Sequence, residues 1–229
     1  MLKAGVIGCG FIGADSPDSH MKGYQECPDI ILMALCDSDL TRIPYPERGE
    51  YEEYTDYMQM VISMQTVLSE KLDIVSVCTP TKTHARIVTD IAPYVKAINC
   101  EKPIAESVAD ADEMIRVCKE YGVILQVNHQ RRFSQPVFRW SRGYVHNGTH
   151  VVDFLRQIGA LGKVRLEYID TQDYIFELDI HTNPAKNRLT LRGIEHLITC
   201  VKEGRESISS GWEARETLRL LLKEGINDY

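Results

Sequence analysis

The sequence predicts an α/β protein in which a doubly wound parallel sheet is followed by a smaller α+β domain with an open antiparallel sheet. Three observations predict this fold class. Short apolar segments alternate with helical patterns up to residue 128, a glycine-rich motif follows the first segment, and a strictly alternating pattern appears only later. Strands that are apolar throughout are typical of parallel sheets covered on both faces, whereas alternation is typical of half-buried antiparallel strands. We therefore expect one domain at 1–128 and a second at 129–229.

Five apolar segments are expected to form the parallel strands. They are residues 2–7, 30–36, 73–78, 96–100 and 123–127. Helical periodicity lies between them, over residues 54–70 and 107–121, and Ser107 is a typical helix cap. The tyrosine- and glutamate-rich segment 44–54 breaks the pattern and is expected to be a solvated loop. Strands that alternate with helices imply βαβ crossovers.

The second domain is expected to contain three helices and an antiparallel pair of strands. The helices are residues 147–159, a segment carrying Leu191, Ile194, Leu197, Ile198 and Val201 that stops at Gly204, and a segment from Trp212 to Lys223. Residues 163–170 and 174–180 alternate polar and apolar side chains, as half-buried strands do. An open sheet with Tyr168, Tyr174 and Phe176 would expose apolar surface, so we expect a homodimer or homotetramer.

Composition and charge disfavour several classes of protein. The 229 residues carry a formal net charge of −7, which disfavours binding to nucleic-acid phosphates. No segment approaches the ~18 consecutive apolar residues of a membrane span, and the N-terminus lacks the pattern of a signal peptide. The seven cysteines are scattered and show no ligand spacing. We therefore expect reduced thiols in a cytoplasmic protein.

Gly8, Gly10 and Gly13 form the pattern G-x-G-x-x-G directly after the first strand. The first glycine would permit a tight turn, the second would let the backbone approach a pyrophosphate, and the third would let helix and strand pack closely. Phe11 and Ile12 lie in the same loop. In this context the motif predicts a dinucleotide-binding domain of the Rossmann type, with a purely structural turn as the alternative.

Asp37 follows the second strand, where a carboxylate can bind the hydroxyl groups of an adenosine ribose. Such a carboxylate would repel a 2′-phosphate, which favours NAD over NADP. Asp37 lies 29 positions after Gly8, more than the usual ~20, and the polar segment 14–20 accounts for the excess. A plain turn residue is the alternative, and Arg42 leaves NADP possible.

Thr79, Pro80 and His84 follow the third strand, and Glu101 and Lys102 follow the next one. Because the carboxyl ends of parallel strands meet at the edge where ligands bind, these residues are expected to line a cofactor groove. The proline after Lys102 restricts the preceding backbone and would hold the lysine toward the cleft, where it could stabilise a developing alkoxide. The alternatives are a helix-capping threonine, a surface histidine and an exposed lysine.

His146, His150 and Asp153 lie at helical spacing in the segment HNGTHVVD. An imidazole can take a proton from a carbinol near neutral pH, and a carboxylate one turn away can orient it, so His150 is a candidate acid–base. Asp153 could instead be a satisfied polar group. A metal pair of His146 and His150 lacks an evident third ligand, so no metal is expected.

Six stretches together resemble the glucose–fructose oxidoreductase / inositol dehydrogenase family of NAD(P)-dependent sugar and polyol dehydrogenases. They are AGVIGCGFIG, DIVSVCTPTKTH, NCEKPIAESVADADEMI, GVILQVNHQRRFSQP, NGTHVVDFLRQIGALG and GRESISSGWEARETLRLL, in family order. The resemblance implies an N-terminal Rossmann domain and a C-terminal domain whose open sheet mediates oligomerisation. It also implies hydride transfer between a sugar or cyclitol hydroxyl carbon and nicotinamide.

The resemblance also implies site residues. Those for the cofactor are Gly8, Gly10 and Gly13 on the pyrophosphate, Asp37 on the ribose, and Thr79, Pro80, His84 and Glu101 beside the nicotinamide. Those for the substrate are Lys102, which also contacts the cofactor, His150 as acid–base, and Arg132, His146 and Asp153.

Two features depart from the family pattern. His146 stands where aspartate is common, and Asn147 follows Phe133 by only 14 positions, an interval in which family members place a helix and strands. The second domain is therefore expected to be shortened. Two functions stay open: an NAD(P)-dependent oxidoreductase acting on a sugar, sugar nucleotide or cyclitol, and a non-catalytic dinucleotide-binding regulatory or assembly protein with a decayed substrate pocket.

Overall fold

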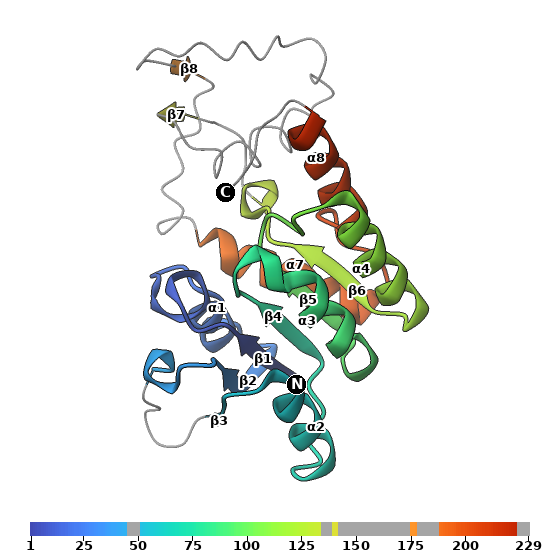
Figure 1. Cartoon of the computed structure of the whole chain (residues 1–229). Helices are drawn as coiled ribbons and strands as arrows, with labels where there is room; N and C mark the ends of the chain where they lie inside the picture. The colour runs from blue at the N-terminus through green and yellow to red at the C-terminus, as the bar shows by residue number, and fades with distance from the viewer. Residues whose placement is uncertain (45–50, 134–138, 142–174, 178–187, 224–229) are drawn as a thin grey trace.

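The computed structural model describes residues 1–44, 51–133, 139–141, 175–177 and 188–223 (Figure 1). Its main feature is a six-stranded parallel sheet with the order β3-β2-β1-β4-β5-β6. The strands are β1 Leu2–Ile7, β2 Ile30–Cys36, β3 Glu52–Tyr54, β4 Ile74–Val77, β5 Ala97–Cys100 and β6 Ile124–Val127. This order confirms the predicted doubly wound fold. It reverses between β1 and β4, and ligands of such sheets bind outside the carboxyl ends of the strands at the reversal.

The edge strand β3 corrects the prediction of a loop over residues 44–54. It pairs in parallel with β2, and Ala34 lies opposite Glu52. An edge strand is held by backbone hydrogen bonds along one side and needs no apolar run, so its sequence gave no strand signal. Glu52 and Glu53 are exposed, as an edge position allows.

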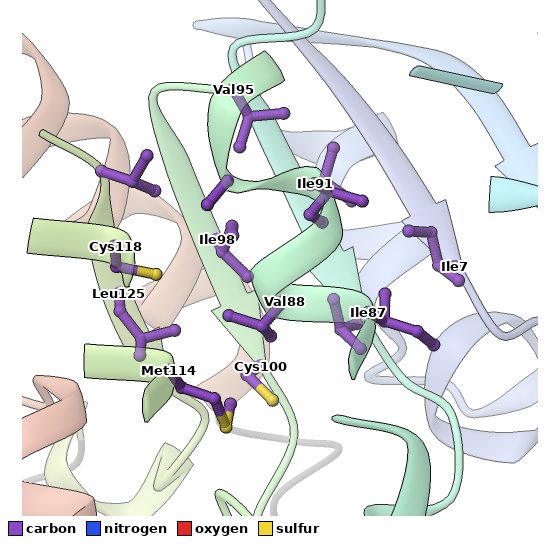
Figure 2. Packing of buried hydrophobic residues seen from close by; sticks show 14 of the residues in the cluster. Ile7, Ile87, Val88, Ile91, Val95, Ile98, Cys100, Met114, Cys118 and Leu125 are labelled. Atoms are coloured by element: carbon purple, nitrogen blue, oxygen red, sulfur yellow. The ribbon is translucent and has the colours of Figure 1, made fainter. Parts of the chain in front are cut away.

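One face of the sheet carries a core shared with three helices. These are α2 Tyr57–Thr66, α3 His84–Ile91 and α4 Val108–Glu120. Figure 2 shows Val88 and Ile91 of α3 beside Ile98 of β5 in this core. Burying a side chain of this size contributes roughly 1.5–3 kcal/mol, so the apolar faces hold the helices in place. Ser107 caps α4 as predicted, since its hydroxyl accepts the N–H of Asp110 at 3.1 Å.

The other face is covered by α1 His20–Glu26 and by α7 Leu189–Glu203, which comes from the second half of the chain. The two helices approach closely, because a Cβ at Gly23 would lie 2.5 Å from Cδ1 of Ile194. Tyr24 and Ile194 share their core with β1 and β2. Asp18, just before α1, also accepts the N–H of Thr190 at 3.1 Å in the first turn of α7.

The last helix, α8 Gly211–Lys223, joins the first core through Ala214 and Leu218 and packs against α4. Two helices of the predicted second domain therefore complete the layers around the first sheet. The predicted division into 1–128 and 129–229 stays a prediction.

The remaining described strands form a short antiparallel pair. They are β7 Arg139–Ser141 and β8 Ile175–Glu177. The latter falls inside the strand predicted at 174–180. The strand predicted at 163–170 and the helix predicted at 147–159 lie outside the described residues, so the open antiparallel sheet stays a prediction.

Short helical turns occupy several connections. They are η1 Phe11–Asp15, η2 Leu40–Arg42, η3 Thr81–Thr83, η4 Ala92–Tyr94 and η5 Gln130–Phe133. Among the helices that the structure describes, none is long and apolar enough to cross a membrane.

Candidate active site

The glycine loop lies at the carboxyl end of β1, and two of its glycines are required by their surroundings. Gly8 has a φ of +91°, and a Cβ there would lie 2.7 Å from the carbonyl carbon of Cys78. A Cβ at Gly13 would lie 1.9 Å from the carbonyl oxygen of Gly8. Gly8 therefore makes the tight turn and Gly13 the close packing, as the motif predicts.

Gly10 has different surroundings. Its φ is −75°, which any residue can adopt, and the nearest atom to an added Cβ is Nη1 of Arg42 at 4.0 Å. Nothing in the folded chain itself therefore demands glycine here. The open space in front of Gly10 fits a group that approaches the backbone closely, which is how a pyrophosphate binds in this motif.

The chain continues from Gly10 into the five-residue π-helical turn η1, not directly into a long helix. The N–H of Ala14 donates to the carbonyl of Gly10 at 2.9 Å and that of Ser16 to the carbonyl of Phe11 at 2.7 Å. Amides at the start of a helical turn have no partner within it, which suits an anion. Phe11 is 71% exposed and Ile12 is half-buried, so both lie at the surface of the loop.

Asp37 is bonded to the glycine loop. Its Oδ2 accepts the N–H of Cys9 at 2.8 Å and its Oδ1 accepts the N–H of Asp39 at 3.0 Å. The carboxylate therefore stands beside the loop despite the long spacing in the sequence. Arg42 is also close, and its guanidinium lies 3.7 Å from Asp39.

The ends of β4 and β5 form the other side of the site, and His84 ties them together. Its Nε2 lies 2.8 Å from the carbonyl oxygen of Thr79 and its Nδ1 lies 3.0 Å from that of Pro103. The ring is only 1% exposed, so it is packed between the two loops. Its predicted place beside the cofactor stays a prediction. Thr79 is half-buried and Pro80 is exposed.

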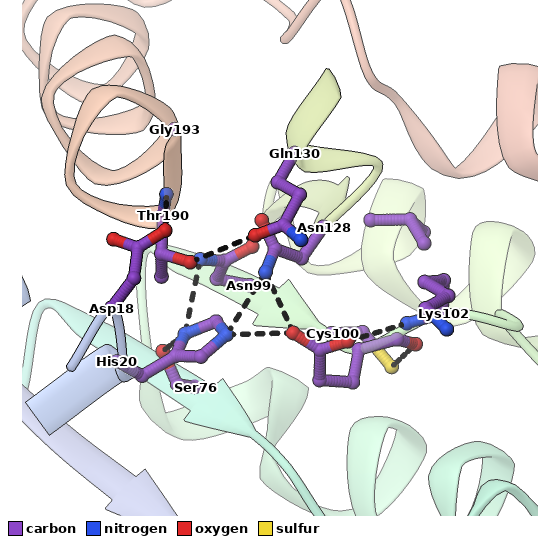
Figure 3. A network of polar contacts seen from close by, with 12 residues as sticks. Asp18, His20, Ser76, Asn99, Cys100, Lys102, Asn128, Gln130, Thr190 and Gly193 are labelled. Atoms are coloured by element: carbon purple, nitrogen blue, oxygen red, sulfur yellow. Dashed lines mark hydrogen bonds and ion pairs between the residues drawn. The ribbon is translucent and has the colours of Figure 1, made fainter. Parts of the chain in front are cut away.

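Glu101 is a buried carboxylate with donors on both oxygens. Its Oε1 accepts from Nε2 of His20 at 2.9 Å and from Nδ2 of Asn128 at 2.6 Å, and its Oε2 accepts the N–H of Lys102 at 3.2 Å (Figure 3). Burial raises the pKa of Glu101, but the hydrogen bond and charge of His20, the hydrogen bond from Asn128 and the charge of Lys102 lower it to about 2. Glu101 is therefore ionised at neutral pH.

Lys102 is half-buried and follows directly after this carboxylate, and the peptide bond between Lys102 and Pro103 is cis. The glycine loop and Glu101–Lys102 thus leave neighbouring parts of the same sheet edge, after β1 and β5, with β4 between them. This arrangement can hold a dinucleotide across the edge, with an ammonium group at its far end.

Two of these residues, His20 and Asn128, were missed by the sequence analysis. His20 lay in the segment 14–20 that was interpreted as a polar insertion, and it is completely buried. The available signal was a polar side chain inside each of three apolar strands, at Ser76, Asn99 and Gln126.

Arg132 is bonded to the C-terminal part of the chain. Its side chain is 4% exposed, bonds the carbonyl of Ile208 and lies 3.3 Å from the carboxylate of Glu213 in α8. Its predicted contact with substrate stays a prediction. The predicted site residues His146, His150 and Asp153 lie outside the described residues.

The cysteine thiols are poor nucleophiles. Burial and the nearby charge of Asp37 raise the pKa of Cys9, which lies in the nucleotide loop, to about 12. Burial likewise raises the pKa of Cys36 and Cys118 to about 12. Chemistry at this site therefore does not depend on a thiolate. No cluster of potential metal ligands occurs among the residues with described positions.

Comparison with known proteins agrees with this geometry. The oxidoreductase family with an NAD-binding Rossmann fold, GFO_IDH_MocA, matches residues 2–129. Myo-inositol 2-dehydrogenase of Thermotoga maritima is 33% identical over 187 residues, which cover 79% of this chain and 52% of that protein. The uncharacterised oxidoreductase YrbE of Bacillus subtilis is 28% identical over 185 residues, which cover 79% and 51%. The chain thus spans about half the length of the curated relatives it matches.

A solved structure shares the fold. The oxidoreductase from Agrobacterium radiobacter, in complex with NAD+, L-tartaric acid and magnesium, aligns with a TM-score of 0.72 at 16% identity, covering 96% of this chain and 94% of that one. At this identity the likeness concerns the fold alone. The match of the family model over residues 2–129, more than half of the chain, confirms the resemblance seen in the sequence motifs: the chain belongs to the GFO_IDH_MocA oxidoreductase family, with its NAD-binding Rossmann fold.

Proposed function

We propose that the protein is an NAD-dependent oxidoreductase that transfers a hydride between nicotinamide and a hydroxyl-bearing carbon of a sugar, sugar nucleotide or cyclitol. The observation that carries this proposal is the open space at Gly10, with Asp37 on one side and the ends of β4 and β5 on the other. The relative named myo-inositol 2-dehydrogenase supports the substrate class.

NAD is the preferred cofactor in this proposal. Both oxygens of Asp37 accept backbone N–H groups, so the carboxylate is held in place with lone pairs left for ribose hydroxyl groups. A 2′-phosphate at the same place would meet this negative charge. Arg42, near Gly10, is the group that would partly offset that repulsion, so NADP is the weaker ligand.

The chain binds and orients the cofactor, which supplies the nicotinamide carbon that accepts the hydride. Thr79, Pro80, His84 and Glu101 would lie beside the nicotinamide, and the contacts of His84 with the carbonyl oxygens of Thr79 and Pro103 join the two loops. Such positioning lowers the barrier because the reacting groups are already aligned.

Residues that face the substrate transfer the proton and stabilise the developing negative charge. Lys102 donates a hydrogen bond to the substrate hydroxyl oxygen and stabilises its negative charge as the hydride departs. His150 accepts the hydroxyl proton, and Asp153 orients its ring. His146 and Arg132 contact the substrate.

The test is a screen of sugars, nucleotide sugars and cyclitols with NAD and with NADP, read as absorbance of the reduced cofactor. Lys102→Ala should lower any turnover by about 100-fold, the usual loss when a donor to a developing oxyanion is removed. Lys82→Ala is the matched control, because Lys82 is an exposed lysine beside the same sheet edge. Full activity of Lys102→Ala and His150→Ala would refute the assigned roles. Tight NAD binding without turnover of any compound would favour the non-catalytic alternative.

We also propose a cytoplasmic homodimer or homotetramer that takes a small-molecule substrate and binds neither nucleic acid nor membrane. The support is the apolar face predicted for the strands at 163–170 and 174–180. Light scattering should give a mass at least twice that of the chain, and a clean 26.1 kDa species would contradict it.

A further inference from the structure

The interior of the parallel sheet contains a row of polar side chains. Ser76 of β4, Asn99 of β5 and Gln126 of β6 occupy matching registers, so they lie side by side across three neighbouring strands. All three are completely buried. Strands of this kind are normally apolar throughout, and an unsatisfied buried polar group is costly. Each group in the row must therefore have a hydrogen-bond partner. Which atom donates and which accepts in each of these bonds shows how the side chains are oriented.

A backbone carbonyl fixes the direction of the hydrogen bonds in the row. The carbonyl oxygen of Gly193, in α7, can only accept, so Nε2 of Gln126 donates to it at 3.0 Å. The same Nε2 donates to Oδ1 of Asn99 at 3.3 Å, and Oε1 of Gln126 accepts the hydroxyl of Ser207 at 2.7 Å. Asn99 must therefore direct its Nδ2, a donor, toward Nδ1 of His20, 3.4 Å away.

The row leads to the ring of His20, whose two nitrogens have different neighbours. Nδ1 faces the Asn99 donor and the hydroxyl of Ser76 at 2.8 Å, which itself bonds the hydroxyl of Tyr24 at 2.7 Å. Nε2 lies 2.9 Å from Oε1 of Glu101 and 3.2 Å from Nδ2 of Asn128. Because the ionised carboxylate can only accept, Nε2 carries the hydrogen that is donated to Glu101. Figure 3 shows the His20 ring between Ser76, Asn99 and Asn128.

We propose that His20 is a positioning residue of the dehydrogenase site: its Nε2–H holds the Glu101 carboxylate in one orientation, and Glu101 in turn holds the backbone that carries Lys102. The second link is the bond from the Lys102 N–H to Oε2 of Glu101 at 3.2 Å. The low pKa of Glu101 supports the pairing, because a charged acceptor strengthens both bonds. The hydrogen-bonded link from His20 to Lys102 is independent of the proposed function. Only the expected effect of a displaced Lys102 on turnover rests on that function.

The test uses two amide variants that differ by one methylene group. The amide nitrogen of His20→Gln reaches the place of Nε2 and can still donate to Glu101. The amide of His20→Asn ends near the place of Nδ1 and cannot. Tyr24→Phe is the matched control, because Tyr24 is on the same helix and equally buried but bonds Ser76 and not Glu101.

The first readout is the Lys102 amide in the full chain without cofactor, measured by NMR. His20→Asn should shift its proton resonance upfield and speed its hydrogen exchange by about 10-fold, the size expected for losing a bond to a charged group. His20→Gln and Tyr24→Phe should keep the wild-type values. Equal values in His20→Asn and wild type would overturn the proposal. If His20→Asn does not fold, Asn128→Ala removes the other donor on the same oxygen and should shift the same amide.

The second readout is turnover with NAD. His20→Asn should lower kcat about 10-fold or more with little change in the KM for NAD, and His20→Gln should recover most of it. A purely structural role predicts equal losses in Tyr24→Phe and His20→Asn, which would overturn the proposal. The positioning role of His20 and the proposed function can be refuted independently. A wild-type chain that binds no NAD would refute the function, whereas the Lys102 amide measurement would still test the role of His20.

Discussion

Gly10 and Gly13 belong to one motif but have different surroundings. We therefore expect Gly13 to be needed for folding and Gly10 for binding of the cofactor. A Cβ at Gly13 would lie 1.9 Å from the Gly8 carbonyl oxygen, so Gly13→Ala should destabilise the fold by about 1–3 kcal/mol or more. A Cβ at Gly10 meets no atom closer than 4.0 Å. Gly10→Ala should therefore keep the wild-type Tm while lowering NAD affinity by at least about 10-fold. Calorimetric melting and NAD titration check both, and equal NAD affinity in Gly10→Ala and wild type would contradict the role given to Gly10.

Glu101 should contribute to stability in a pH-dependent way. Its pKa in the folded chain is about 2, below the ordinary value of 4.5, so its contribution is complete above about pH 4.5 and is lost as the pH falls toward 2. The shift corresponds to about 3 kcal/mol. Glu101→Gln should therefore be less stable than wild type at about pH 6, and the gap should narrow at about pH 3. Urea unfolding at both pH values measures this, and a gap that widens in acid would be the wrong sign.

Only some residues of the candidate site could be predicted from the sequence. Asp37 and Lys102 each follow a strand that is visible in the sequence, so their edge of the sheet could be inferred. His20 could not be found this way, because it lies 81 positions from Glu101 and becomes relevant only when α1 covers that face. The burial of His84 between the carbonyl oxygens of Thr79 and Pro103 could not be inferred either, because it depends on how the two loops meet.

The strands that consist of an unbroken apolar segment were predicted well. The expected strands 2–7 and 30–36 match β1 and β2 at both ends, because buried strands need unbroken apolar runs. The edge strand β3 has no such run and was missed. The glycine motif usually opens a helix, but here η1 intervenes and α1 begins only at His20, where Ser19 caps it.

The end of α7 gives a prediction at this scale. The sequence predicts that the helix stops at Gly204, and this residue has a φ of +64° with nothing within 4 Å of an added Cβ. Gly204→Ala should therefore cost only the backbone penalty, about 1 kcal/mol. Glu203→Ala, at the neighbouring exposed position, should stay within about 0.5 kcal/mol of wild type. Chemical unfolding compares the two, and an unchanged stability in Gly204→Ala would show that the left-handed end is not needed.

For the whole molecule, the layers do not follow the order of the chain. One face of the N-terminal sheet is completed by α7, from residues that the sequence analysis assigned to a second domain. The hydrophobic pattern of α7 showed that it has a buried face but not which sheet it covers. The periodicity of a sequence does not predict which surface a helix packs against, because an amphipathic helix fits any apolar surface.

A chain ending after residue 133 should therefore not fold cooperatively. Without α7, it would leave Ala97 and Ile124 on the face of β5 and β6 that α7 contacts, and the polar row would lose the Gly193 carbonyl. Circular dichroism melting and binding of a hydrophobic dye should show a broad transition and exposed apolar surface, whereas the full chain melts sharply. A sharp melt of the shortened chain would instead support an independent domain at 1–128.

Titration of the full chain with NADH, followed by nicotinamide fluorescence, tests most directly whether this sheet edge holds a dinucleotide. Saturable one-to-one binding to wild type, weakened at least about 10-fold in Gly10→Ala at unchanged Tm, is the predicted result. No saturable binding to a well-folded wild-type chain, or identical curves for both proteins, would contradict it.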